Sequence, residues 1–485
     1  MKRQRLLKYG QRCMMLFNSN FFLYVFLPAF LLLYYAAFFG TKHPVAIGNG
    51  IILIFSLLFY LCTGGKSIFL LLCVIVCNFA CAQVMEAFPA HRRMMLAGGI
   101  AANIGVLLYF KYSGFLYENL ARIAGVFDAD TAKRFLDIAL PVGISFYIFQ
   151  AMSYLFDVYK GMAAQKSLCK FALYISLFPQ LVAGPIVRYH SVCSEIDRRS
   201  VDIDCIYEGA CRFVAGLGKK VLIADILGNA VDSIWALQPA SLSAALSWSA
   251  AFLYSLQIYY DFSGYSDMAI GLGGMLGFHF PENFILPYIS ANVTEFWKRW
   301  HISLSSFLKD YLYIPLGGNR NGVFRTYRNL LVVFLACGLW HGAAWNFVFW
   351  GLYHGFFLVL ERFLDNRFHF RMKGFAGRAV TWFIVMAGWV LFRAGSLEGA
   401  LSFYKAMLGA GVLEGYQYFS YSYYIYPRVL AAAAAAFVMA FWPFLRLRER
   451  FQNSRVRGFA MVLVLMICMA YMSDASFTPF IYFQF

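Results

Sequence analysis

The stretch "ACGLWHGAAWNFVFWGLYHGFF", residues 336–357, places two histidines in a segment that is otherwise apolar and aromatic. His341 stands between Trp340 and Gly342, and His354 follows within the same segment. An ionisable side chain inside a membrane-spanning segment costs about 2.5–3.5 kcal/mol on insertion scales, so such residues are functional candidates by default. Whether this argument applies depends on the rest of the chain.

The composition of the chain predicts an integral membrane protein. Of 485 residues, 61% are hydrophobic and 13% are charged, whereas an average soluble domain is about 45–50% apolar and about 25% charged. Apolar runs approach the ~20 residues that a helix needs to cross hydrocarbon, and they lack the alternation of a membrane β-barrel. The clearest runs are residues 21–39, 67–85, 94–110, 213–231, 429–444 and 459–472. We therefore predict an all-α, polytopic protein with on the order of eleven transmembrane helices.

No linker, repeat or long polar block divides the chain, so we expect a single membrane domain over residues 15–485. The first 14 residues are rich in lysine and arginine, and Met14 and Met15 are alternative start sites. We therefore expect residues 1–14 to form a non-essential basic tail.

Further basic residues gather in short loops, at residues 320–328 and 446–457. By the positive-inside rule these loops are predicted to face the cytosol, and no nucleic-acid partner is expected. The eleven cysteines form no CxxC pair. Cys73, Cys77 and Cys81 share one helical face, but zinc sites usually draw ligands from several elements, so no metal site is expected.

Two segments interrupt the pattern of membrane helices. Residues 296–320, "FWKRWHISLSSFLKDYLYIPLGGNR", repeat aromatic and aliphatic residues every three or four positions. This predicts an amphipathic helix, interfacial or packed inside the fold, that Pro315, Gly317 and Gly318 end. Residues 178–190, "FPQLVAGPIVRYH", hold two prolines and a glycine. This pattern predicts a re-entrant or broken helix, which is tolerated only where protein or water covers the backbone.

His341 is the strongest functional candidate among the polar groups of the apolar segments. Counted from Asn329, it lies about 18 Å along a helix, past the middle of a ~30 Å core. We expect Gly338 and Gly342 to leave room beside its ring. Asp261, in "YYDFSGYSDMAIGLGG", has a structural reading as a hydrogen-bond acceptor, and the glycines of that stretch predict close helix packing.

Several motifs resemble the membrane-bound O-acyltransferase family, and within it the branch that acetylates bacterial alginate. They are residues 17–28, 178–189, 259–273, 297–320, 339–355 and 477–485. The resemblance implies a helical ring with a central tunnel that reaches the catalytic histidine. By the same resemblance, His341 corresponds to the family's essential histidine and His301 to its second site position, whereas His354 belongs to no catalytic motif.

The resemblance also implies the chemistry, which is transfer of an acyl group from a thioester to a hydroxyl. A buried neutral His341 would accept the hydroxyl proton, and His301 would orient a carbonyl or the donor by hydrogen bonding. Other residues of the motifs are candidates for lining or supporting the tunnel: Trp340, Trp300, Asp261, Ser303, Asn346 and His354. Four basic residues are candidates for holding the donor's phosphates, although each can equally set topology: Lys298, Arg299, Lys309 and Arg320.

The expected donor is acetyl-coenzyme A or another acyl thioester, with no tightly bound cofactor. The expected acceptor is an exported polysaccharide, reached directly or through an extracytoplasmic, esterase-like acetyltransferase of the SGNH type. The expected location is the inner membrane of a bacterium, embedded in its lipid bilayer. D-alanyl transfer, or acetylation of peptidoglycan or cellulose, is an alternative for the same fold. A secondary transporter or a secretion scaffold is an alternative from another class.

Overall fold

The structure is a computed structural model, and it describes residues 15–125, 128, 131, 134–135, 138–238, 241–410, 420–441, 455–474 and 480. Over these residues the secondary structure is helical, with one isolated β-bridge between Phe284 and Trp300. The basic tail expected at residues 1–14 and most of the arginine-rich loop at residues 446–457 lie outside this part of the chain.

Two compact units divide the chain. The first comprises Met1–Phe213, Met268–Pro281 and Met472–Pro479, and the second comprises Val214–Asp267, Glu282–Tyr471 and Phe480–Phe485. The single membrane domain expected from the sequence stays a prediction.

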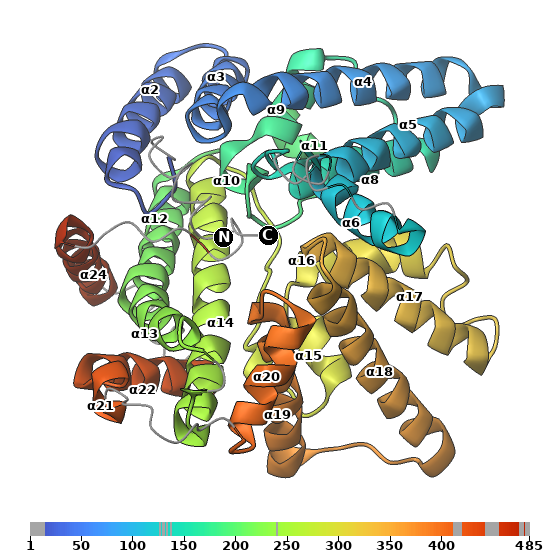
Figure 1. The fold of residues 1–485 in the computed structure, drawn as a ribbon. Helices are drawn as coiled ribbons and strands as arrows, with labels where there is room; N and C mark the ends of the chain where they lie inside the picture. The colour runs from blue at the N-terminus through green and yellow to red at the C-terminus, as the bar shows by residue number, and fades with distance from the viewer. Residues whose placement is uncertain are drawn as a thin grey trace. The chain divides into compact units, whose positions relative to one another are not determined.

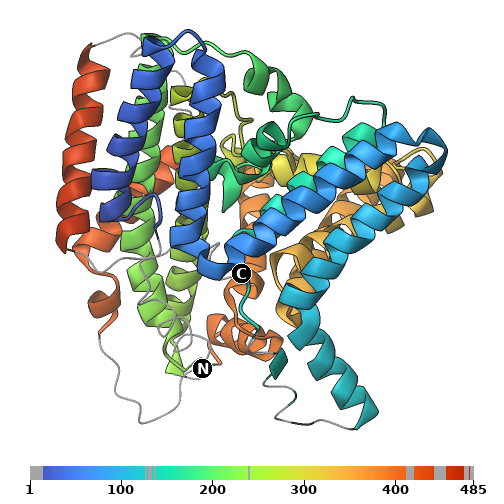
Figure 2. The ribbon, with the colours of Figure 1, turned by 90° about the horizontal axis from the view of Figure 1, so that it is seen from above.

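Helices of the first unit form the N-terminal half of the chain (Figure 1). They are α2 (Leu27–Gly40), α3 (Pro44–Gly64), α4 (Ile68–Ala87), α5 (Arg92–Leu107), α6 (Ser113–Ala124), α8 (Ile144–Tyr159), α9 (Leu168–Ser176), α10 (Phe178–Leu181) and α11 (Tyr189–Asp197). α12 (Ile203–Gly218) begins in this unit, and α14 (Ala244–Met275) ends in it. α4 and α5 run side by side, and both pack against α8 (Figure 2).

The broken helix predicted at residues 178–190 is confirmed. α10 is four residues long, and non-helical backbone follows it as far as α11. Residues 181–187 are buried, as irregular backbone in an apolar protein must be.

The predicted packing role of the glycines near residue 271 is also confirmed. A Cβ atom at Gly271 would lie 2.5 Å from the carbonyl oxygen of Gly209 on α12. The two backbones approach so closely that neither position has room for a side chain.

The second unit holds residues 336–357, with His341 and His354. Its main elements are π-helix η5 (Lys219–Ala224), α13 (Asp225–Trp235), most of α14, α15 (Val293–Arg299), α16 (Ile302–Leu308), α17 (Val323–His341), α18 (Trp345–Phe368), α19 (Gly374–Arg393), α20 (Leu397–Met407), α21 (Tyr421–Tyr424), α22 (Pro427–Phe441) and most of α24 (Arg455–Asp474). α17 packs along α18, and α18 packs against α19.

Within the described residues, seven helical segments are long and apolar enough to cross a membrane. They are Phe22–Gly40, Pro44–Ala87, Pro89–Ala124, Val323–His341, Trp345–Phe368, Gly374–Arg393 and Arg455–Ser473. Pro44–Ala87 contains both α3 and α4. The all-α, polytopic class is thus confirmed, whereas the eleven crossings and the ring with a tunnel stay predictions.

Candidate active site

The segment predicted as one amphipathic helix is two helices with a break at His301. α15 ends at Arg299, α16 begins at Ile302, and His301 between them has φ 45° and ψ 54°. A non-glycine residue in this left-handed region is strained by about 1–3 kcal/mol, and such strain is often found at functional sites. The prediction of one continuous helix was wrong because the apolar periodicity continues across the break.

Residues 283–285 hold this break in place. The backbone N–H of Ile285 donates to the carbonyl of Arg299 at 3.0 Å, and that of Ile302 donates to the carbonyl of Asn283 at 3.0 Å. The Oδ1 atom of Asn283 lies 3.0 Å from Nδ1 of His301. Asn283 is fully buried and is not among the predicted site residues.

His301 is buried and lies outside the seven candidate membrane spans. Removal from water disfavours the charged imidazolium, and this lowers the pKa of His301 from 6.5 to about 3. The ring is therefore neutral at physiological pH. Its edge meets the ring of Phe262 on α14, with the ring centres 4.7 Å apart.

His341 is the last residue of α17 and faces the same cluster of rings. Its ring centre lies 6.5 Å from that of His301, so the structure brings together the two histidines selected as catalytic candidates. Trp340 lies beside both rings, at 4.9 Å from His341 and 5.8 Å from His301. Trp350 and Phe392 complete the wall around His341, at 5.1 and 5.2 Å.

The expected role of the glycines beside His341 requires correction. α17 starts at Val323 and is continuous from Asn329 to His341, its last residue, so the depth of His341 in a membrane stays a prediction. A Cβ atom at Gly342 would lie 2.2 Å from the ring of Phe347, and one at Gly338 would lie 2.3 Å from the carbonyl oxygen of Phe347. These glycines therefore make room for α18 and for the ring of Phe347.

His354 lies on α18, fully buried among aromatic rings. The rings of Trp297 and Trp350 are each 5.0 Å from it. A Cβ atom at Gly388 on α19 would lie 2.6 Å from its Nε2 atom, so this glycine makes room for the imidazole. His354 is thus packed in the core, and the ring of Trp350 contacts both His354 and His341.

The remaining support candidates have defined structural positions. Trp300 is buried and packs against Trp389, with ring centres 4.8 Å apart. Ser303 donates its hydroxyl hydrogen to Oδ1 of Asn283 at 2.9 Å. Asn346 donates to the carbonyl of Ala394 at 2.7 Å and so ties α18 to the end of α19.

Asp261 belongs to a buried charge cluster outside the histidine pair. Its Oδ1 atom accepts a hydrogen bond from Nζ of Lys220 at 2.7 Å, and Asp225 contacts the same Nζ at 2.7 Å. Lys220 is 1% exposed. Asp261 is thus a hydrogen-bond acceptor, as predicted, but its partner is a lysine that was not among the predicted residues.

The four candidates for holding phosphate differ in their availability. Arg299 forms an ion pair with Glu295 at 3.0 Å, and its guanidinium also donates to the carbonyl of Ile285. Lys298, Lys309 and Arg320 have exposed side chains. Arg299 thus stabilises the turn that carries His301, and the other three present charge at the surface.

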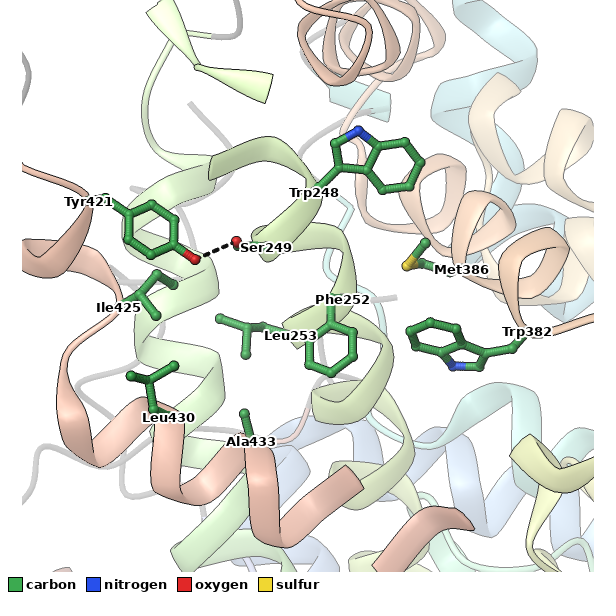
Figure 3. A pocket seen from close by; sticks show the side chains of 10 residues that line it. All are labelled: Trp248, Ser249, Phe252, Leu253, Trp382, Met386, Tyr421, Ile425, Leu430 and Ala433. Atoms are coloured by element: carbon green, nitrogen blue, oxygen red, sulfur yellow. Dashed lines mark hydrogen bonds between the residues drawn. The ribbon is translucent and has the colours of Figure 1, made fainter. Parts of the chain in front are cut away.

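A separate apolar groove of about 430 Å³ lies in the same unit, between α14, α19 and the α21–α22 region (Figure 3). Trp248, Phe252 and Trp382 line it, and its serine is engaged, since Ser249 and Tyr421 share a hydrogen bond of 2.8 Å. Neither His301 nor His341 lines this groove. It offers no group for acyl transfer.

The second unit therefore holds two buried histidines close together, and comparison with known proteins identifies the class of protein that carries them. The chain belongs to the membrane-bound O-acyltransferase family, whose model matches residues 164–398, a region that includes both histidines. The protein is therefore a multi-pass membrane acyltransferase, and the resemblance predicted from the motifs is confirmed.

Individual relatives cover most of the chain. It is 38% identical to the probable alginate O-acetylase AlgI of Pseudomonas putida, over 97% of this chain and 100% of that protein. It is 43% identical to the protein of the same name from Pseudomonas aeruginosa, over 82% of this chain and 76% of that protein. It is 37% identical to the peptidoglycan O-acetyltransferase of Helicobacter pylori, over 81% of this chain and 80% of that protein.

Proposed function

We propose that this protein is an O-acetyltransferase of the bacterial inner membrane that acts on an exported polysaccharide. It takes the acetyl group from a cytosolic thioester, acetyl-coenzyme A, and passes it across the membrane. The observation that carries the proposal is the pair of buried imidazoles, His301 and His341, whose ring centres lie 6.5 Å apart.

Two imidazoles at this separation suit acyl transfer from a thioester to a hydroxyl. As the hydroxyl oxygen forms its bond to the carbonyl carbon, its proton passes to an imidazole of the pair. The carbon–sulfur bond then breaks, and the departing thiolate takes up a proton to become a thiol. General acid–base help of this kind contributes about 10²–10⁴-fold to a rate.

The path of the acetyl group is part of the same proposal. A ring of about eleven transmembrane helices around a central tunnel would let a donor from one side and an acceptor from the other reach the two histidines. The exposed Lys298, Lys309 and Arg320 would attract the donor's phosphates by charge. No tightly bound cofactor is needed for this chemistry.

The proposed acceptor is an alginate-like polysaccharide, because relatives whose names state alginate O-acetylation match at 38–43% identity. Peptidoglycan is the second candidate, since a relative at 37% identity is named for its acetylation. We further propose that an extracytoplasmic, esterase-like acetyltransferase completes the transfer.

The test is acetyl transfer by the purified protein in lipid vesicles, with radiolabelled acetyl-coenzyme A, the esterase-like partner and either polymer. We expect labelled polymer only when the partner is present. His341→Ala should lower the rate of thiol release by about 10²–10⁴-fold. The matched control is His279→Ala, because the side chain of His279 is 79% exposed and pairs with Glu195 within the first unit.

Two results would contradict the proposal. One is undiminished thiol release from well-folded His341→Ala protein. The other is no transfer to either polymer by the wild-type protein with its partner. Labelled peptidoglycan in place of labelled alginate would change the acceptor and leave the reaction intact.

A further inference from the structure

One amide oxygen beside the site receives hydrogen bonds from three directions. Oδ1 of Asn283 lies 3.3 Å from the backbone nitrogen of Ser303, 2.9 Å from the hydroxyl of Ser303 and 3.0 Å from Nδ1 of His301. All three residues are buried, so water cannot readily replace any of these partners.

The backbone contact fixes which way the amide of Asn283 points. The oxygen and nitrogen of an asparagine side chain are assigned from the surrounding hydrogen bonds. A backbone N–H can only donate, so the atom that faces Ser303 must be the oxygen. The amide nitrogen is consistent with this orientation, because Nδ2 of Asn283 donates to the hydroxyl of Ser266 on α14 at 3.1 Å.

This orientation decides the tautomer of His301. Because Oδ1 of Asn283 can only accept, Nδ1 of His301 must carry the hydrogen. A neutral imidazole has one N–H and one nitrogen that accepts. Burial lowers the pKa of His301 to about 3, so the ring stays neutral and its Nε2 is the accepting nitrogen.

We infer that Asn283 is a positioning residue that locks His301 in the Nδ1–H tautomer, so that Nε2 accepts a hydrogen bond from the substrate hydroxyl. This polarity is opposite to the one expected from the sequence, where His301 was to donate to a carbonyl. A neutral ring whose only N–H is bound to Asn283 cannot donate to the thioester. The identity of the hydroxyl rests on the proposed function, but the tautomer does not.

The aromatic groups around His301 do not change the assignment of a neutral ring with its hydrogen on Nδ1. The rings of Phe262, Phe284 and Trp340 lie 4.7, 6.5 and 5.8 Å away and do not ionise at physiological pH. In the part of the chain that the structure describes, the imidazole of His341 on α17 is a titratable group that faces His301.

The tautomer can be measured without any assay of activity. The chain has eight histidines, so ¹⁵N-histidine spectra of the protein in lipid, compared with those of His301→Gln, would isolate the signals of His301. We expect a protonated Nδ1 and an unprotonated Nε2 at neutral pH. A protonated Nε2 in the wild-type protein would overturn the inference whatever the activity.

Three variants separate positioning from simple structural support. Asn283→Ala removes the acceptor, so we expect a mixture of tautomers and a loss of about tenfold in kcat, equivalent to about 1.4 kcal/mol. Ser303→Ala removes one donor to the same oxygen, and we expect the tautomer of His301 to be unchanged. Asn283→Asp keeps an acceptor at this place, and we expect it to keep the tautomer.

The pH profile of Asn283→Asp gives the sharpest readout. A carboxylate next to an imidazole stabilises the protonated ring and raises its pKa by about 1–3 units. The acid limb of the rate profile should therefore move to higher pH, while activity at alkaline pH stays above that of Asn283→Ala. Equal losses in both variants, with unshifted pH profiles and an unchanged tautomer, would mean that Asn283 only supports the fold.

The two proposals fail in different ways. If wild-type His301 has the expected tautomer but no acetyl transfer occurs with partner and polymer, the proposed function fails and the role of Asn283 stands. If transfer occurs but Nε2 of His301 carries the hydrogen, the proposed function stands and the role of Asn283 fails.

Discussion

Replacing Gly342 by alanine tests how the end of α17 is built next to His341. The backbone of Gly342 has φ −166° and ψ 150°, an extended conformation that any residue adopts. The substitution therefore adds no backbone strain. Its effect must come from the new methyl group, which would lie 2.2 Å from two carbon atoms of the Phe347 ring.

The size of the effect follows from that distance. Carbon atoms in contact are about 3.5–4.0 Å apart, so either the ring or the helix end must move by about 1.3–1.8 Å. Phe347 is buried and packs against Phe392 with ring centres 5.2 Å apart, which leaves it little freedom. Overpacking of this kind costs about 1–3 kcal/mol, and we expect a lower Tm together with displacement of His341 and loss of activity.

The assay is a double-mutant cycle on protein in detergent, with Tm and acetyl transfer measured for each variant. Phe347→Ala alone should also destabilise the protein, by about 3–5 kcal/mol, because it opens a cavity. In Gly342→Ala/Phe347→Ala the added methyl group enters the vacated space. The loss in the double variant should therefore be smaller than the sum of the two single losses, by about 0.5–3 kcal/mol.

Gly50→Ala is the matched control, since a Cβ atom there would meet nothing within 4 Å. Alanine is favoured over glycine within a helix by about 1 kcal/mol, so α3 should tolerate this change. The reasoning is refuted if Gly342→Ala keeps the wild-type Tm and loses activity that Phe347→Ala does not restore. Gly342 would then make room for substrate, as the sequence had suggested.

Further predictions concern the histidines, the buried charge cluster and the topology. His341→Ala should abolish polymer acetylation at a normal membrane level on immunoblots, and near-normal acetylation would remove its catalytic role. His301 has a pKa lowered to about 3, so protonation opposes folding as pH falls from about 6.5 towards 3; His301→Gln should therefore weaken the fall of Tm with acid, and an unchanged slope would contradict the buried neutral ring. Lys220→Met leaves buried carboxylates without their cation and should cost about 3–5 kcal/mol, whereas Asp261→Asn keeps an acceptor and should cost less; equal Tm losses would argue against the cluster. A cysteine placed at Asn321 in a cysteine-free background should resist impermeant reagent in intact cells, and efficient labelling would reverse the predicted orientation.

The sequence was informative wherever structure depends on neighbours along the chain. Prolines and a glycine within residues 178–190 limit helix formation locally, and the helix breaks there. The apolar runs around His341 and His354 become α17 and α18 for the same reason, because helical periodicity is a local property. The motifs also selected both histidines that the structure brings together.

The sequence was uninformative wherever contacts between distant segments determine the local conformation or the partner of a side chain. Nothing in the spacing of residues 296–320 signals a break at His301, since the left-handed conformation depends on pairing with residues 283–285. Lys220 lies within the apolar run of residues 213–231, and only the fold brings Asp225 and Asp261 to it. Asn283 carried one available signal, a polar residue in the aromatic stretch "FPENF" shortly before the histidine segment.

Both histidines stand at helix ends, and this placement explains how a pair of titratable rings can be built into so apolar a protein. Within a helix the backbone N–H groups are bound to the helix itself, so a buried polar side chain finds few partners there. At the start of α16 the N–H of Ser303 remains available, and it orients the amide of Asn283, which in turn binds His301. α17 ends at His341, whose ring centre lies 6.5 Å from that of His301, and the chain leaves the helix at Gly342. The break at His301 therefore lets the N–H of Ser303 bind Asn283, since a helix that continued from residue 296 through residue 303 would bind that N–H itself.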